Sequence, residues 1–553
     1  MRKELLLLGA FGMLTTATLC AQEFHLQPTP QEYITQKDSV DIPRQYQILS
    51  GNSVQDGPAL PLLRSLMPEE VLGASFRVYI GVKGDKIIKK YQHRIPRKSE
   101  GYFLKIEKDC IVIAGADERG AYYGVQTLAQ LLALDKLPLA EVTDYPDVPY
   151  RGVVEGFYGA PWSQEACIRQ LDFYGRNKMN VYIYGPKDDP YHRTPNWRKP
   201  YPAREGEELK VLVNRAKENN VIFYWAIHPG QDIRWNEEDR SLLLQKFESM
   251  YQLGVRGFAV FFDDISGEGT KADKQAELLN YIDDHFVKVK RDVAPLILCP
   301  TEYNKSWTDV EGGYLTTLGD KLNEGIKVMW TGDMVVATID KSTLDFVNPL
   351  LKRKAYIWWN FPVSDYVQDH LLLGPVYGNG LDVKDDMSAF VSNPMEHAEA
   401  SKISLYSVAD YTWNMENYDS ETSWKHAVRD LMPLHAEYLE IFAAHNSDPG
   451  QNGHRFRREE SVAIQPALSA LLKAYQEKNE IDEDAYRQVA EECRKIIVAA
   501  DGLLASGNEN RPLITEIRPW LIQFKQVGEY GAEVLNMIRL RQQKDAFIAV
   551  SYT

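Results

Sequence analysis

The sequence predicts an α/β protein whose central part is a (β/α)₈ barrel. From Tyr150 onward, short apolar runs alternate with longer stretches of helical periodicity, and eight such pairs fit into about 300 residues. One run, Gly257–Phe262, continues directly into two carboxylates, Asp263 and Asp264. Residues that follow a barrel strand lie at the catalytic face, so this pair is the first candidate for chemistry. The structural alternative is that one of the two carboxylates only caps the next helix.

Each expected strand is a short apolar run, as in strands that are buried on both faces of a parallel sheet. The eight runs are 151–158, 180–184, 221–227, 257–262, 296–300, 326–330, 355–359 and 403–408. A long loop, about 362–402, is expected between the last two. A doubly wound open sheet is the alternative, but no glycine-rich phosphate-binding motif follows the first strand.

Two further regions flank the barrel. An N-terminal α/β domain is expected first, because alternating apolar runs are followed by a helical pattern, and a proline-punctuated boundary ends near Pro149. A helical bundle is expected last, with Leu468, Leu471 and Leu472 on one helix face. The helical pattern runs up to Thr553, so we expect a truncated version of a longer protein. The expected parts are 1–21, 22–147, 148–450 and 451–553.

The first 21 residues have the pattern of a signal peptide. Arg2 and Lys3 precede an apolar core, and Ala21 ends a cleavage site. We therefore expect an exported protein, periplasmic or secreted. Lipoprotein anchoring through Cys20 is the less favoured alternative, because Leu19 is bulky where a small residue is expected. No other stretch approaches the roughly 18 consecutive apolar residues of a membrane span.

Composition limits the partners and cofactors. The net charge of -15 argues against a nucleic-acid partner, and the sequence sets no oligomeric state. A metal-dependent barrel hydrolase is the main rival class, but only His228 follows a strand, and no HxH or HExxH motif occurs. We therefore expect no metal and no cofactor. The remaining cysteines lack metal-ligand spacing and are expected to be buried free thiols: Cys110, Cys167, Cys299 and Cys493.

Polar and aromatic residues gather where the expected strands end. They combine carboxylates, amides and aromatic rings with one lysine, the parts from which sugar-binding sites are built. Besides the Asp pair and His228, they include Gly156, Tyr158, Lys187, Cys299, Glu302, Tyr303, Thr331, Asp333, Trp358, Asn360, Asp365, Asp410, Tyr411 and Trp413.

The adjacency of Asp263 and Asp264 restricts the mechanism. Neighbouring Cα atoms are about 3.8 Å apart, so the two carboxylates cannot easily flank a glycosidic bond as a two-carboxylate glycosidase requires. They could instead serve neighbouring atoms of a substrate that carries its own nucleophile, such as a 2-acetamido group. We also expect such a close pair to hold one proton between them.

Three motifs occur in order along the chain: Arg151-Gly-Val-Val-Glu-Gly-Phe-Tyr-Gly-Ala-Pro-Trp162, Tyr184-Gly-Pro-Lys-Asp-Asp189 and Phe262-Asp-Asp-Ile265. Together they closely resemble glycoside hydrolase family 84, the O-GlcNAcases and related bacterial β-N-acetylglucosaminidases. The resemblance implies a retaining, exo-acting and substrate-assisted reaction through an oxazoline, on GlcNAc-bearing glycans or glycoproteins. A carbohydrate-binding protein with a degenerate site is the alternative from another class.

The resemblance also implies roles for individual residues. Asp263 would orient the acetamido group, Asp264 would act as acid and base, and Tyr303 would bind the acetamido oxygen. Cys299 would line the methyl pocket, although a plain core thiol is as good an interpretation. The other residues implied to hold or surround the sugar are Gly156, Tyr158, Lys187, Thr331, Trp358, Asn360, Asp365 and Asn393.

Overall fold

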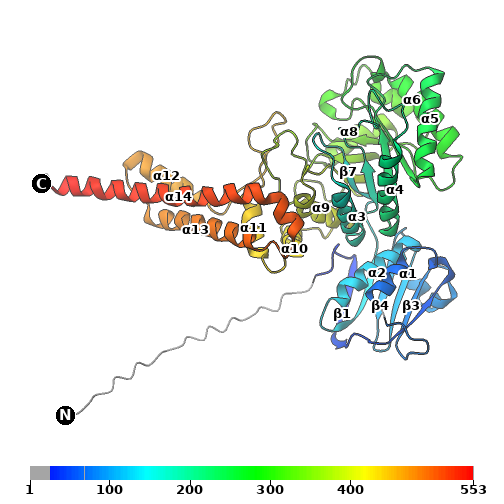
Figure 1. Cartoon of the computed structure of the whole chain (residues 1–553), viewed down its shortest axis with the longest axis horizontal. Helices are drawn as coiled ribbons and strands as arrows, with labels where there is room; N and C mark the ends of the chain where they lie inside the picture. The colour runs from blue at the N-terminus through cyan, green and yellow to red at the C-terminus, as the bar shows by residue number, and fades with distance from the viewer. Residues whose placement is uncertain (1–24, 68, 552–553) are drawn as a thin grey trace, which may run out of the picture.

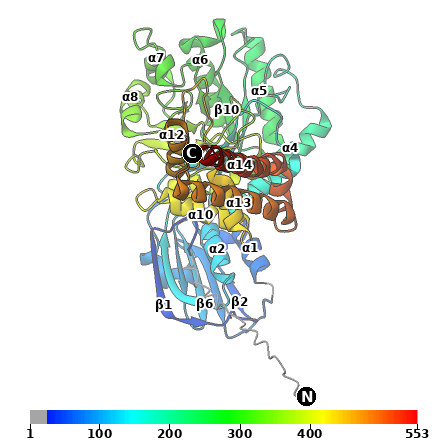
Figure 2. The ribbon, with the colours of Figure 1, turned by 90° about the vertical axis from the view of Figure 1, so that its left-hand side faces the viewer.

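The computed structural model describes residues 25–67 and 69–551, so the expected signal peptide lies outside the described residues. Three bodies follow one another along the chain: an N-terminal sheet, a closed barrel, and helices that project away from both (Figure 1). Seen along the projecting helices, the barrel and the N-terminal sheet lie at opposite ends of the molecule (Figure 2). Within the described ranges, no helix is both long and apolar enough to cross a membrane.

The N-terminal body is a mixed six-stranded sheet in the order β1-β6-β4-β5-β3-β2. Two helices, α1 (Ala59–Leu66) and α2 (Glu118–Leu132), bury leucines such as Leu63 and Leu128 against it. The α/β character expected for this region is confirmed. The strands are β1 Glu32–Val40, β2 Gln47–Ser50, β3 Arg77–Val82, β4 Tyr102–Ile106, β5 Cys110–Gly115 and β6 Leu137–Asp144.

The predicted barrel is confirmed. Eight parallel strands, β7 to β14, close in chain order when β14 pairs with β7. They are β7 Tyr150–Glu155, β8 Val181–Tyr184, β9 Ile222–Ile227, β10 Gly257–Phe261, β11 Ile297–Cys299, β12 Lys327–Trp330, β13 Ala355–Trp359 and β14 Met387–Ser392. The surrounding helices are α3 Gln164–Arg176, α4 Ala203–Glu218, α5 Glu237–Gln252, α6 Ala272–Ile282, α7 Tyr314–Lys321, α8 Lys341–Leu351 and α9 Ala398–Trp413.

The predicted position of the eighth strand is wrong. The barrel closes with β14, and residues 403–408 lie inside helix α9. Every residue of α9 is buried, so the helix lacks the polar face that would have revealed a helical period. Asp410 and Tyr411, which were expected to follow that strand at the catalytic face, have structural partners. The Asp410 carboxylate accepts from the Thr29 backbone N–H at 2.7 Å, and the Tyr411 hydroxyl donates to the Gly380 carbonyl.

The expected C-terminal helical region is also confirmed. It comprises α10 Ser420–Leu431, α11 Ala436–Ala444, α12 Gln465–Lys478, α13 Glu483–Ala505 and α14 Arg511–Ser551. Leu471 is buried in one cluster with Val489, but Leu468 and Leu472, which were expected on the same face as Leu471, are exposed. Of the four described cysteines, all free, Cys110 is only half-buried, because it begins a strand beside a solvent-facing turn.

Candidate active site

The twelve residues that the family resemblance assigns to the site line one cavity at the carboxyl ends of the barrel strands. Its volume is about 380 Å³, within the range of small-ligand sites. The cavity brings together Gly156, Tyr158, Lys187, Asp263, Asp264, Cys299, Tyr303, Thr331, Trp358, Asn360, Asp365 and Asn393. Asn393 belongs to this group because β14, and not residues 403–408, is the last strand.

Asp263 continues the alternation of strand β10 into the cavity. Ala259 and Phe261 point into the barrel, whereas Val260 and Phe262 pack against the surrounding helices. The next inward side chain is therefore Asp263, which is buried. One carboxylate oxygen, Oδ2, is bonded to the Lys187 ammonium, and the other, Oδ1, has no hydrogen-bond partner among the residues that the structure describes.

The surroundings of Asp263 keep it ionised. Burial alone would raise its pKa, but the positive charge of Lys187 and the influence of His228 outweigh burial and hold the pKa well below the usual range. His228 Nε2 donates to the Asp263 backbone carbonyl at 2.7 Å and lies 3.4 Å from Oδ1. The expectation that the two aspartates share a proton is therefore wrong, because Lys187 compensates the charge of Asp263.

Asp264 adopts a different backbone conformation and has different partners. Its φ of 53° lies in the left-handed region, which breaks the alternation of the strand, so Asp264 lines the same cavity as Asp263. The Tyr158 hydroxyl donates to Oδ2 at 2.7 Å and the Tyr303 hydroxyl to Oδ1 at 2.8 Å. Burial and the nearby Asp264 raise the pKa of both phenols, so both remain donors at neutral pH. The exposed Asp264 is thus held in the mouth of the cavity.

Amide groups form a fixed polar wall on another side of the cavity. Asn360 Oδ1 accepts from the Trp358 indole at 2.8 Å and from Asn393 Nδ2 at 2.9 Å. Asn393 Oδ1 in turn accepts from the Gly156 backbone N–H at 3.3 Å. Asp365 accepts from the Tyr158 backbone N–H at 2.9 Å. These bonds orient each amide before any ligand arrives, which lowers the entropy cost of binding.

Small residues shape the cavity floor. A Cβ on Gly156 would lie 2.4 Å from the Trp358 ring, so only glycine fits there. Cys299 ends β11 as a buried residue, and burial raises the pKa of its thiol well above the usual range. Cys299 is therefore a neutral, weakly polar wall and not a nucleophile.

Six lining residues were missed, because only the residues directly after each strand were considered. They are Trp307, Val335, Val336, Val363, Tyr366 and His454. Most lie a few residues further along the loops that follow the same strands, so they could be found by considering each whole loop and not only its first residues. His454 follows the barrel and no strand precedes it, so its sequence position gave no signal. Conversely, Glu302 and Asp333 follow strands but do not line the cavity.

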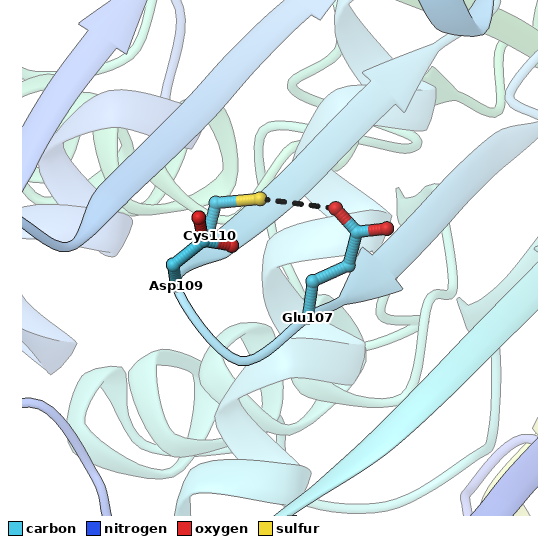
Figure 3. A group of neighbouring side chains, drawn as sticks. All are labelled: Glu107, Asp109 and Cys110. Carbon is cyan, nitrogen blue, oxygen red and sulfur yellow. Dashed lines mark hydrogen bonds between the residues drawn. The ribbon is translucent and has the colours of Figure 1, made fainter.

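Potential metal ligands gather elsewhere. Among the described residues, one group of three brings suitable atoms together: Glu107, Asp109 and Cys110, at the β4–β5 turn of the N-terminal sheet (Figure 3). Burial and then Glu107 raise the pKa of the Cys110 thiol to about 12, and Lys105 already pairs with Glu107 at 2.7 Å. A protonated thiol and a paired carboxylate are poor ligands. The prediction that the reaction needs no metal stays a prediction.

A closed (β/α)₈ barrel with two carboxylates in the cavity at its strand ends is an architecture that glycoside hydrolases use. Family models match the three bodies: beta-N-acetylglucosaminidase over residues 151–444, the post-catalytic domain of bacterial GH84 over 460–553, and domain 2 of glycosyl hydrolase family 20 over 23–145. The chain belongs to glycoside hydrolase family 84.

Individual relatives agree with this assignment. The structure of CpGH84B is 33% identical with a TM-score of 0.87, and the match covers 95% of this chain and 94% of that one. The structure of CpGH84D is 29% identical with a TM-score of 0.88, and the match covers 96% of this chain and 92% of that one. Protein O-GlcNAcase of Rattus norvegicus is 35% identical over 276 residues, which are 48% of this chain and 30% of the relative. The chain therefore matches less than a third of that curated relative.

Proposed function

We propose that this chain is a retaining, exo-acting β-N-acetylglucosaminidase that uses the acetamido group of its substrate as the nucleophile. The observation that carries the proposal is the pairing of two adjacent carboxylates with unlike surroundings. Asp263 is ionised, and its buried oxygen Oδ1, 3.4 Å from His228 Nε2, has no hydrogen-bond partner among the described residues and is the atom that would accept an N–H. Asp264 is exposed and bonded to two phenols at the cavity mouth.

The steps follow from these positions. Asp263 Oδ1 would accept the acetamido N–H, which makes the acetamido carbonyl oxygen a better nucleophile. That oxygen would attack the anomeric carbon as the bond from this carbon to the leaving oxygen breaks. Asp264 protonates the leaving oxygen, and the N–H proton passes to Asp263, which leaves a neutral oxazoline. Asp264 would then deprotonate the water that opens the oxazoline and restores the original configuration. Tyr303 would bind the acetamido oxygen, and Cys299 and Thr331 would line that side of the pocket.

The remaining lining residues would hold the sugar ring. Trp358 offers an aromatic face, and the amide wall and Asp365 offer paired donors and acceptors for hydroxyl groups. The natural substrates would be glycans or glycoproteins with terminal β-linked GlcNAc, including O-GlcNAc on Ser or Thr, as the name of the rat relative suggests. No cofactor takes part in this scheme.

Aryl glycosides test this proposal directly. The enzyme should hydrolyse an aryl N-acetyl-β-glucosaminide at least 10³-fold faster than the matching aryl β-glucoside, since effective molarities of intramolecular nucleophiles are very large. Comparable turnover of both would rule out acetamido participation. Unchanged activity in a chelator would separate this scheme from a metallohydrolase. Binding without any turnover would favour the carbohydrate-binding alternative.

We also propose that the protein is exported to the periplasm or beyond. The support is the sequence pattern of residues 1–21, a basic start followed by an apolar core. N-terminal sequencing of the protein from the exported fraction should find a start at residue 22. Recovery with Met1 retained in the cytosolic fraction would contradict export, and a lipid-modified Cys20 would support the lipoprotein alternative.

A further inference from the structure

The cavity contains one residue that lies outside the barrel. His454 belongs to the post-barrel loop, which we define as residues 445–464 between α11 and α12. The family model that matches the barrel ends at residue 444, and the one that matches the C-terminal helices begins at residue 460, so neither covers His454. The sequence comparison therefore assigns this residue no role.

The post-barrel loop is firmly attached to the barrel. The buried Arg458 donates to the carbonyls of Tyr377 at 3.0 Å and Pro375 at 2.9 Å, and its guanidinium lies 3.7 Å from the centre of the Tyr377 ring. Asp448 accepts from the Arg458 backbone N–H at 2.8 Å. Charge-assisted bonds of this kind fix a loop. His454 is therefore held at the cavity.

His454 packs against Tyr366, a second lining residue from the β13–β14 loop. Their rings meet edge to face at 4.8 Å and 84°. The Tyr366 hydroxyl is buried and has no hydrogen-bond partner among the described residues. His454 and Asp365 line the same cavity, and the charge of Asp365 opposes the lowering of the His454 pKa by burial. Unpartnered polar atoms in a ligand cavity are places for ligand hydroxyls.

Tyr158 shows which part of the sugar this wall would meet. Its hydroxyl donates to Asp264, whereas its backbone N–H donates to Asp365. The length of the Tyr158 side chain therefore separates the carboxylates of Asp264 and Asp365. With C1 and C2 of the sugar at the Asp pair, the far side of the pyranose ring, C4 and C5, points toward Asp365. The O4 and O6 hydroxyls are therefore the groups that approach Tyr366 and His454.

We infer that His454 and Tyr366 close the cavity at the O4 and O6 end and confine it to terminal GlcNAc without substituents there. This inference rests on the proposed function for the identity of the sugar. The imidazole and the phenol act as specificity-determining groups: they bind the free hydroxyls and leave no room for a larger group. The post-barrel loop thereby sets the exo specificity of the barrel.

Kinetics with methylated substrates test the inference. Wild type, His454→Ala, Tyr366→Phe and the exposed loop control Gln451→Ala are compared on an aryl N-acetyl-β-glucosaminide and on its 4-O-methyl and 6-O-methyl ethers. His454→Ala should raise KM about tenfold for the parent substrate, the worth of about one hydrogen bond, with little change in kcat. It should also lower, by about tenfold, the ratio of kcat/KM for the parent substrate to kcat/KM for at least one of the two ethers. Tyr366→Phe should raise KM and keep the preference, and Gln451→Ala should match wild type.

Unchanged preferences in His454→Ala for both ethers would overturn the inference, and so would an equal change in Gln451→Ala. Calorimetric titration of the same proteins with free GlcNAc and its two methyl ethers measures the affinity for each sugar, and it needs no turnover. Absence of turnover in the wild type would thus count against the proposed function alone, whereas equal binding of the three sugars by the wild type would count against the closed wall.

Discussion

Asp263 and Asp264 are neighbours in sequence, but their surroundings separate their chemistry. Lys187 and His228 contact Asp263, whereas Tyr158 and Tyr303 contact Asp264. A positive partner stabilises the anion, and phenol donors fix a side chain without neutralising it. The division of labour between two identical residues therefore comes from their partners and from the left-handed backbone of the second.

Replacing Lys187 should move the acid limb of the pH–rate profile. The ammonium holds the pKa of Asp263 low, so Lys187→Met lets this pKa rise toward and above its usual range. Because the reaction needs ionised Asp263, kcat should begin to fall at a correspondingly higher pH. The profile of kcat against pH from 3 to 8 checks this, and Lys305→Met, outside the cavity, is the control. An unshifted acid limb would argue against the ion pair.

Removing the acid should matter in proportion to the leaving group. Asp264→Ala should lower kcat/KM about 10²–10⁴-fold for an alkyl glycoside, since a poor leaving group needs protonation. For a dinitrophenyl glycoside, whose leaving group departs as an anion, the loss should be much smaller. Both rates are measured on the same protein preparation. Equal losses on the two substrates would contradict the acid role.

A single methyl group at Gly156 should disturb the sugar pocket. The added Cβ would lie 2.4 Å from the Trp358 ring and push it into the cavity, at a cost of about 1–3 kcal/mol. Gly156→Ala should therefore lower kcat/KM at least about tenfold. Gly206→Ala in α4 is the matched control, because its Cβ meets only Leu253 at 3.9 Å. A fully active Gly156→Ala would contradict the tight contact.

The sequence predicted the site residues better than their partners. Residues that follow an apolar strand are identifiable from one sequence, because parallel strands bring their ends to one edge. The contact of Lys187 with Asp263 and the phenols on Asp264 depend on loop conformations that no local pattern encodes. His454 depends in addition on how a loop returns to the barrel after two further helices.

At the scale of elements, seven of the eight barrel strands were predicted at the correct places. The short apolar runs of β7 to β13 stand out because each is bounded by polar loops. Strand β14 was missed since the nearby α9 offered a stronger apolar run, and a helix buried on every side gives no amphipathic signal. Helix α9 is buried because α3, α10, α14 and the barrel strands β7 and β14 pack around it, and Trp413 at its end belongs to the core of the N-terminal sheet.

Glu516 of α14 should make this packing sensitive to pH. Its carboxylate accepts from the Ala400 backbone N–H near the start of α9 at 2.7 Å, and burial raises its pKa to about 7. The native state therefore binds a proton that the unfolded chain releases near pH 4.5. The stability from this group is complete below about pH 4.5 and is lost as the pH rises to about 7.

Glu516→Gln cannot lose this proton and should flatten the pH dependence. Between pH 5 and 8 the wild type should lose on the order of 1–3 kcal/mol more stability than the variant. Thermal midpoints of both proteins at several pH values test the difference, with the exposed Glu533→Gln as control. Parallel curves would show that Glu516 titrates normally in the native state.

At the scale of the molecule, the three bodies meet around buried polar contacts. Asp144 of the N-terminal sheet accepts from the Trp413 indole of α9 at 2.7 Å and pairs with the buried Lys178 at 3.1 Å. Arg151 of the first barrel strand pairs with Glu100 of the N-terminal body at 2.7 Å. Buried ion pairs across such contacts fix orientation more than they add stability. The domain limits at 147 and 450 stay predictions.

The central claim is that the amide of the substrate replaces a second catalytic carboxylate. Aryl glycosides with acetamido, fluoroacetamido, difluoroacetamido and trifluoroacetamido groups test it most directly, because fluorine withdraws electrons from the attacking carbonyl oxygen. We predict that log(kcat/KM) falls steeply and steadily with each fluorine, by several powers of ten across the series. Equal rates for the four substrates would contradict the account and require a nucleophile from the protein.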